Sequence, residues 1–138
     1  MIVVSAVQEK ERQREICGLC GIGYDPDCMA YAALDSVTGE LLGCAQFTLA
    51  AGGVGVLESV GTAELSAEAV KEYTKEGIRL VTGRAAMNFM DLAGFHTGRV
   101  SPELEKDERL MKILGFEKDE NGVRICDLGR LFTGERHK

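Results

Sequence analysis

Residues 77–94, "GIRLVTGRAAMNFMDLAG", decide the fold of this chain of 138 residues. The stretch is apolar on nearly all sides, and its polar side chains, Arg84, Asn88 and Asp91, fall on one narrow stripe at helical spacing. This pattern predicts a helix over residues 77–93 that other elements cover on most sides. The last Gly of the stretch is typical of a helix C-terminus.

Segments that flank this helix predict a sheet. Three short apolar runs precede it, at residues 29–35, 41–49 and 54–60, and the turns between them are too short for crossovers. They therefore predict an antiparallel meander. A strand expected at 95–100 follows the helix, and a connection through a helix places it parallel to the strand at 54–60.

Both ends of the chain add to this sheet. The elements expected there are a strand at 2–7, a helix at 9–19, a helix at 101–114 and a hairpin with strands at 116–118 and 123–128. Residues 134–138 are expected to form a frayed tail. The sequence thus predicts one α/β domain over residues 1–138 with a sheet of mixed direction.

The composition restricts the partners. The net charge is −6, which argues against a nucleic-acid partner, because phosphate contacts need a basic surface. Residues 41–57 carry no charge and approach the minimum length of a membrane span, but Gly52 and Gly53 divide them into two strands. No signal-peptide pattern precedes them. We expect a cytoplasmic protein without a membrane partner, and a homodimer is possible.

Five cysteines indicate packing rather than chemistry. Their number is odd and no secretion signal accompanies them, so reduced thiols are expected. Cys17 and Cys20 form the motif "CGLC", which suggests zinc or redox chemistry. Zinc would need a second such pair, and a redox motif would open a helix, whereas this one closes a helix. We therefore expect buried, metal-free thiols.

Two stretches resemble the GNAT family of N-acetyltransferases. Residues 110–132, "LMKILGFEKDENGVRICDLGRLF", are similar to that family's closing unit, a helix that ends in Leu-Gly-Phe, a polar turn and a strand that ends in Asp-Leu. Residues 74–94, "TKEGIRLVTGRAAMNFMDLAG", resemble the family's cofactor helix. The resemblance covers about residues 29–133. It implies a GNAT-like mixed sheet: an antiparallel meander, a βαβ unit with splayed parallel strands and a C-terminal hairpin.

The resemblance also implies a site for acetyl-CoA. The cofactor helix of the family would hold the pyrophosphate on backbone N–H groups at its start, here at Gly77, Ile78 and Arg79. The backbone at Ser59 and Val60 would face the pantetheine arm.

The cofactor motif departs from the family's Gln/Arg-x-x-Gly-x-Gly/Ala. Only Gly77 matches it, since Thr74 replaces the Gln or Arg and Arg79 replaces the second small residue. The Arg79 side chain would either fill the space of the phosphates or pair with them, and we favour pairing.

In the family, an amine attacks the thioester directly and a general base removes its proton. Glu58, in "VLESV", is the best candidate for that base. The plainer interpretation is that Glu58 is an exposed carboxylate on a strand without a catalytic role. His96 is a second candidate acid or base, although a hydrogen-bonded structural histidine is more common. The Tyr that often protonates the leaving thiolate is replaced by Met111, which has no proton to donate.

These observations leave three functional hypotheses. The first, which we prefer, is an acyl-CoA-dependent N-acetyltransferase that acts on an amine of a small molecule or a protein. The second is a catalytically inactive GNAT-fold protein used for binding or assembly. It would explain Arg79, Met111 and the single short helix available between the first two strands. The third, a thiol redox protein, rests on "CGLC" alone.

Overall fold

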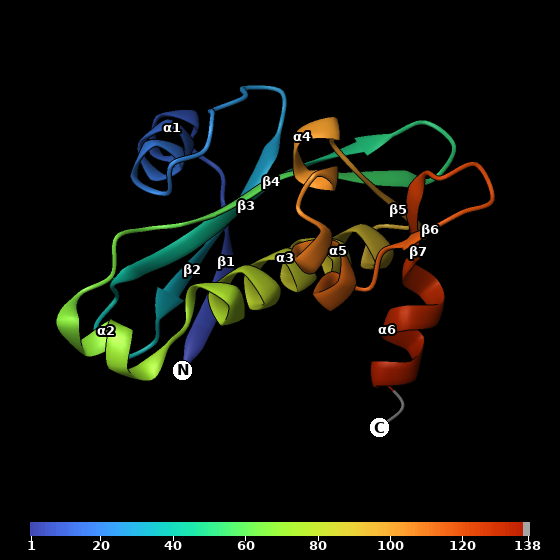
Figure 1. Ribbon diagram of the computed structural model, residues 1–138. Coiled ribbons are helices and arrows are strands. Elements are labelled where there is room, and N and C mark those ends of the chain that lie inside the picture. The colour runs from blue at the N-terminus through green and yellow to red at the C-terminus, as the bar shows by residue number, and fades with distance from the viewer. Residues whose placement is uncertain (137–138) are drawn as a thin grey trace.

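The structure, a computed structural model, describes residues 1–136 and contains one seven-stranded sheet with the order β1-β2-β3-β4-β5-β7-β6 (Figure 1). The strands are β1 (Ile2–Val7), β2 (Met29–Asp35), β3 (Leu41–Ala50), β4 (Val54–Thr62), β5 (Thr97–Val100), β6 (Glu117–Lys118) and β7 (Arg124–Asp127). The helices are α1 (Lys10–Leu19), α2 (Ala67–Glu72), α3 (Lys75–Leu92), α4 (Pro102–Glu105), α5 (Glu108–Leu114) and α6 (Leu128–Arg136).

The strand directions confirm the expected topology. β1 to β4 are antiparallel neighbours in sequence order, which confirms the predicted meander of β2, β3 and β4. β4 and β5 are parallel, with Val54 opposite Thr97 and Leu57 opposite Val100, as the helical connection between them requires. The charge-free stretch of residues 41–57 is the β3–β4 hairpin, and no helix within the described residues is long and apolar enough to cross a membrane.

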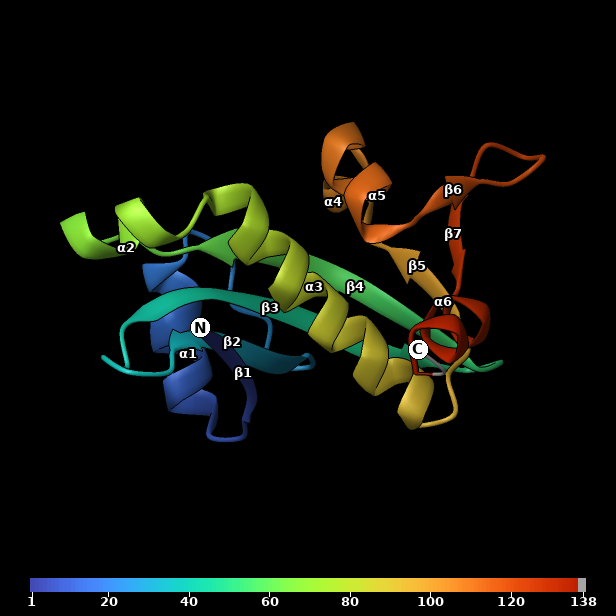
Figure 2. The same ribbon diagram turned by 90° about the horizontal axis from the view of Figure 1, so that it is seen from below.

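Helix α3 lies diagonally across one face of the sheet, while α1 lies on the other face (Figures 1 and 2). The largest core cluster joins α3 to β3 and β4 through side chains such as Met87, Met90, Phe47 and Leu57, which are at most 1% exposed. Gly55 permits the close approach of the helix, because a Cβ there would lie 2.5 Å from the Met90 sulfur. This contact sets α3 directly on β4.

The start of α3 differs from the prediction. The helix begins at Lys75, not at Gly77, because the Thr74 side chain caps it by accepting a hydrogen bond from the Gly77 N–H at 3.0 Å. Gly77 therefore lies inside the first turn, and one of the N–H groups expected to face a phosphate already has a partner within the chain.

The predicted helix over 101–114 is two helices. Ser101 and Pro102 begin α4 as expected, but the Asp107 side chain accepts a hydrogen bond from the Leu110 N–H at 3.1 Å and starts a new helix, α5. Gly115, at φ 99°, ends α5 as predicted.

The C-terminal segment was also predicted incompletely. Asp127 accepts a hydrogen bond from the Arg130 N–H at 3.0 Å, and the chain continues from β7 into α6, a helix that the sequence pattern does not predict. Residues 134–136 of the expected frayed tail belong to this helix, and residues 137–138 lie outside the described residues. All five cysteines are buried and free, and Cys17 and Cys20 pack in a core cluster that also contains Cys44.

Candidate active site

Glu58 occupies a β-bulge in the middle of β4. On the partner strand β3, Gln46 lies opposite Ser59 and Phe47 lies opposite Leu57, so Glu58 is the extra residue. A bulge redirects the side chain of the strand that carries it, and bulges are common beside active sites. The prediction that Glu58 lies on this strand is confirmed. Because of the bulge, Glu58 has no residue directly opposite it on β3.

Next to this bulge, β5 leaves β4. Ser101, the residue directly after β5, makes two hydrogen bonds to β4: its N–H donates to the Leu57 carbonyl at 3.0 Å, and its hydroxyl donates to the Glu58 carbonyl at 2.7 Å. The chain then turns into α4. Among the described residues, no strand pairs with this edge of β4 beyond Glu58. The Val60 carbonyl there accepts a long hydrogen bond of 3.4 Å from the Arg79 guanidinium.

A cleft of about 400 Å³ begins at this unpaired part of β4. We call it the α3–α5 cleft, because the first turns of α3 and α5 form two of its walls and the turn after α1 forms another. It is lined by Val60, Lys75, Glu76, Arg79, Asp107 and Arg109, among others. Two of the five predicted cofactor residues, Val60 and Arg79, therefore line the same cleft.

The other three predicted cofactor residues lie nearby but do not line the cleft. Ile78 is fully buried in the core, and the Gly77 N–H is taken by Thr74. The Ser59 hydroxyl accepts a hydrogen bond from the Gln46 side chain at 3.0 Å.

Two ion pairs connect α3 with α5 beside the cleft. Arg79 contacts the Asp107 carboxylate at 2.7 Å, and Arg109 contacts the Glu76 carboxylate at 2.6 Å. The hydrogen bond from Arg79 lowers the pKa of Asp107, and the Leu110 N–H adds to this effect. With Lys75, the cleft contains three cationic side chains, and two of them already have an anionic partner.

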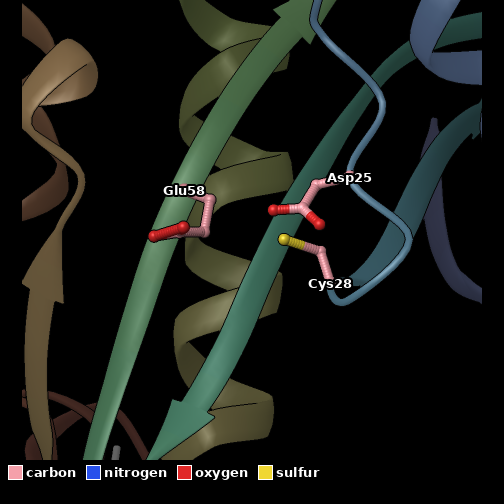
Figure 3. A group of neighbouring side chains, drawn as sticks. All are labelled: Asp25, Cys28 and Glu58. Atoms are coloured by element: carbon pink, nitrogen blue, oxygen red, sulfur yellow. The ribbon is translucent and has the colours of Figure 1, made fainter.

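Asp25 and Cys28 lie beside Glu58, an arrangement that the sequence analysis did not predict (Figure 3). The ligating atoms of the three side chains lie within 4.8 Å of one another. Burial raises the pKa of Glu58, and the negative charge of Asp25 raises it further. The pKa of the Cys28 thiol is raised to about 12, chiefly by burial and then by Asp25 and Glu58. We call this group the Asp25–Cys28–Glu58 cluster.

A buried glutamine fixes the loop that carries Asp25 and Cys28. The Gln46 side chain, in a residue only 2% exposed, accepts a hydrogen bond from the Asp25 N–H at 2.9 Å. It donates to the Gly23 carbonyl at 2.6 Å and to the Ser59 hydroxyl at 3.0 Å. This side chain thus ties the loop between α1 and β2 to β4, one residue from Glu58.

His96 does not join Glu58. It precedes β5 and contacts the buried Asp91 carboxylate through Nδ1 at 2.6 Å. Thr97 lies opposite Val54, and Glu58 is four residues further along β4, which corresponds to about 13 Å of strand. This contact agrees with the structural interpretation of His96.

Comparisons with known proteins define the fold. No protein-family model matches the sequence, and no curated protein matches it. Among solved structures, a spermidine/spermine N-acetyltransferase of Vibrio cholerae superposes with a TM-score of 0.66 at 11% identity, over 97% of this chain and 99% of that chain. An acetyltransferase of Bacillus subtilis in complex with CoA gives 0.62 at 13% identity, over 85% and 77%. The ribosomal-protein-S18-alanine N-acetyltransferase of Escherichia coli gives 0.59 at 10% identity, over 91% and 89%. The chain has the fold of the GNAT acetyltransferases.

Proposed function

We propose that the protein is an acyl-CoA-dependent N-acetyltransferase that moves the acetyl group of acetyl-CoA to an amine. The observation that carries this proposal is the parting of β4 from β5 beside Glu58, with a cleft that leads from Val60 to the first turn of α3. Glu58, a carboxylate of raised pKa, thus lies two residues along β4 from Val60, where the cleft begins. The cationic side chains of the cleft come from α3 and α5. The acetyltransferases that share this fold support the class of reaction.

The α3–α5 cleft suits the phosphate groups of acetyl-CoA. The first N–H groups of a helix have no partner within it, so the backbone of Lys75 and Glu76 offers donors at the positive end of the helix dipole. The side chains of Lys75, Arg79 and Arg109 add positive charge. In this proposal, phosphate oxygens replace the carboxylates that now pair with the two arginines.

Glu58 is the proposed general base. It takes a proton from the acceptor, which leaves a nitrogen lone pair free to attack the thioester carbonyl carbon. The new C–N bond forms and the C–S bond breaks. The acylated nitrogen loses its second proton, which the departing CoA thiolate takes up, and Glu58 later releases the first proton to solvent. Met111, at the position of the family's Tyr, is fully buried and has no proton to give. The raised pKa of Glu58 makes this carboxylate a stronger base.

Acetyl transfer by the Glu58→Gln variant tests the proposal. Release of free CoA is measured with acetyl-CoA and several primary amines, and acetyl-CoA affinity is measured separately by calorimetry. Loss of the base acts on the chemical step, so we expect turnover to fall by about a hundredfold or more. Acetyl-CoA affinity should change by less than about twofold. Asp27→Asn, which removes an exposed charge from the loop after α1, is the control.

Two results would contradict the proposal. Unchanged turnover in Glu58→Gln would make this residue an ordinary strand carboxylate. Binding of acetyl-CoA without transfer to any amine would support the alternative, a catalytically inactive GNAT-fold binding protein.

A further inference from the structure

Strand β1 forms an open edge of the sheet. It is the outermost strand in the sheet order, and among the described residues no other strand lies on its far side (Figure 2). The Ser36 N–H donates to the Met1 carbonyl at 2.9 Å, so these two residues form a hydrogen-bonded pair of the antiparallel β1–β2 ladder. Hydrogen-bonded pairs alternate along such a ladder, so the odd residues of β1 bond to β2 and the even residues face outward. Ile2, Val4 and Ala6 therefore each present one backbone N–H and one C=O at the open edge, and none of the described residues bonds to these groups.

The sequence leaves this edge unprotected. Edge strands are usually shielded by a charged side chain, a proline, a bulge or a covering segment, because free backbone groups pair with strands of other molecules. The strand "IVVSAV", residues 2–7, contains no charge and no proline, and its register with β2 runs without a bulge. The other edge strand, β6, has only two residues. The edge of β1 is thus the one that can receive a further strand.

We propose that β1 pairs with β1 of a second copy of the chain, in an antiparallel ladder whose two-fold axis passes through Val4. In this register, Val4 lies opposite Val4 of the second copy, and Ile2 lies opposite its Ala6. These are hydrogen-bonded pairs, and each exchanges two bonds, so every outward N–H and C=O of both strands finds a partner. An interface with a two-fold axis is self-complementary and closes after two copies, so the two sheets join into one and no chain of further copies follows.

A hollow at the end of β1 supports this register. It has a volume of about 490 Å³ and is lined by Ala6, Val7, Gln8, Glu9 and Arg12. The two-fold axis at Val4 places Met1 of the second copy opposite Val7, beside this hollow. The Met1 side chain is 76% exposed in the single chain, and an odd residue of the strand lies on the same face as Val7. Pairing therefore covers an exposed apolar side chain as well as backbone groups, once at each end of the ladder.

The second copy does not cover the α3–α5 cleft. β2 and β3 separate β1 from β4, and the cleft begins at the edge of β4 that faces away from them. The two-fold pairing of β1 is therefore independent of the proposed function, and its failure would leave the acetyl-CoA site unaffected.

Amide hydrogen exchange, followed by NMR from micromolar to millimolar protein, tests the pairing directly. Analytical ultracentrifugation of the same samples gives the molar mass. We expect dimers to form as the concentration rises, and the amides of Ile2, Val4 and Ala6 to exchange more slowly in step with them. The amides of Val3 and Ser5 already belong to the β1–β2 ladder and should not respond. A monomer at every concentration, a dimer in which Val4 and Ala6 still exchange rapidly, or a larger open assembly would overturn the proposal.

Two variants at one position separate pairing of β1 from any other contact between copies. Ala6→Pro removes an N–H that faces outward and no bond to β2, and Ala6 is exposed, so the fold should be kept. The dimer should weaken by about tenfold or more, because one hydrogen bond is lost at each end of the ladder. Ala6→Ser keeps the N–H and should change the dissociation constant by less than about twofold. Equal dimerisation of Ala6→Pro and the wild type, or equal losses in both variants, would assign the contact to another surface. The exchange measurement uses the unmodified chain, so it decides the question even if Ala6→Pro does not fold.

Discussion

Replacing Asp107 with Asn is expected to strengthen the binding of acetyl-CoA, because it releases Arg79 from an ion pair. In the structure, the Arg79 guanidinium contacts the Asp107 carboxylate at 2.7 Å and lies at the wall of the α3–α5 cleft. If Arg79 is to bind a phosphate, it has to leave Asp107 first. Asn keeps the hydrogen bond that begins α5 at Leu110, since Asn and Asp are equally good helix caps.

The size of the effect follows from the exposure of the pair. The side chains of Arg79 and Asp107 are 27% and 36% exposed, so water and salt weaken their attraction. Such a pair contributes about 0.5–1 kcal/mol, and its release should improve the affinity for acetyl-CoA about two- to fivefold. Arg79→Ala should instead weaken binding by about tenfold or more, because it removes a charged hydrogen bond to the ligand.

Calorimetric titration of acetyl-CoA into the wild type and both variants measures these changes. Asp27→Asn is titrated as a control for the altered net charge. Unchanged or weaker binding in Asp107→Asn, together with unchanged binding in Arg79→Ala, would show that Arg79 does not bind the phosphates. Arg79 would then be a structural link between α3 and α5. Tighter binding in Arg79→Ala would instead mean that its side chain fills the space of the phosphates.

Three further variants test stability, measured by urea denaturation. Arg79→Ala should lower the free energy of unfolding by up to about 1 kcal/mol at pH 7. Arg79 lowers the pKa of Asp107 in the folded state, so this difference should be present above the unfolded pKa and shrink as pH falls through the folded pKa; a difference that grows in acid would contradict it. Gly55→Ala should destabilise the fold by about 1–3 kcal/mol, because the new Cβ meets Met90 at 2.5 Å. Gly18→Ala, with no atom within 4 Å of the new Cβ, should stabilise α1 by about 0.5–1 kcal/mol, and similar effects of the two changes would refute this account.

The order of the sheet could be predicted because it depends on local patterns. The short turns predicted an antiparallel meander, and the apolar helix over residues 77–93 predicted that the next strand would run parallel to β4. The structure has both features. The errors occurred where one polar side chain changes the course of the backbone. Asp107 caps a new helix and so divides the predicted helix over residues 101–114. Asp127 accepts a hydrogen bond at the start of α6, a helix that no apolar run in the sequence predicts.

The sequence predicted the residues of the candidate site that lie on β4, but not those that long-range contacts bring close to it. Glu58 and Val60 were found because they lie on a strand whose neighbours were known. Asp25 and Cys28 were missed because the position of their loop depends on Gln46, a buried side chain 21 residues away from Asp25. The partner of Arg79 is 28 residues distant, and no local pattern indicates it. The one available signal for the cluster was the pair of acids that surrounds Pro26 directly before β2.

Binding of acetyl-CoA in the α3–α5 cleft is tested most directly by a titration of acetyl-CoA that is followed by the backbone amide signals of the protein. The account predicts saturable shifts at Lys75 and Glu76, in the first turn of α3, and at Val60, on the unpaired edge of β4. It also predicts little change at His96, at the far end of β5. The absence of any shift at millimolar acetyl-CoA, or shifts confined to other surfaces, would contradict the assignment of the α3–α5 cleft as the acetyl-CoA site.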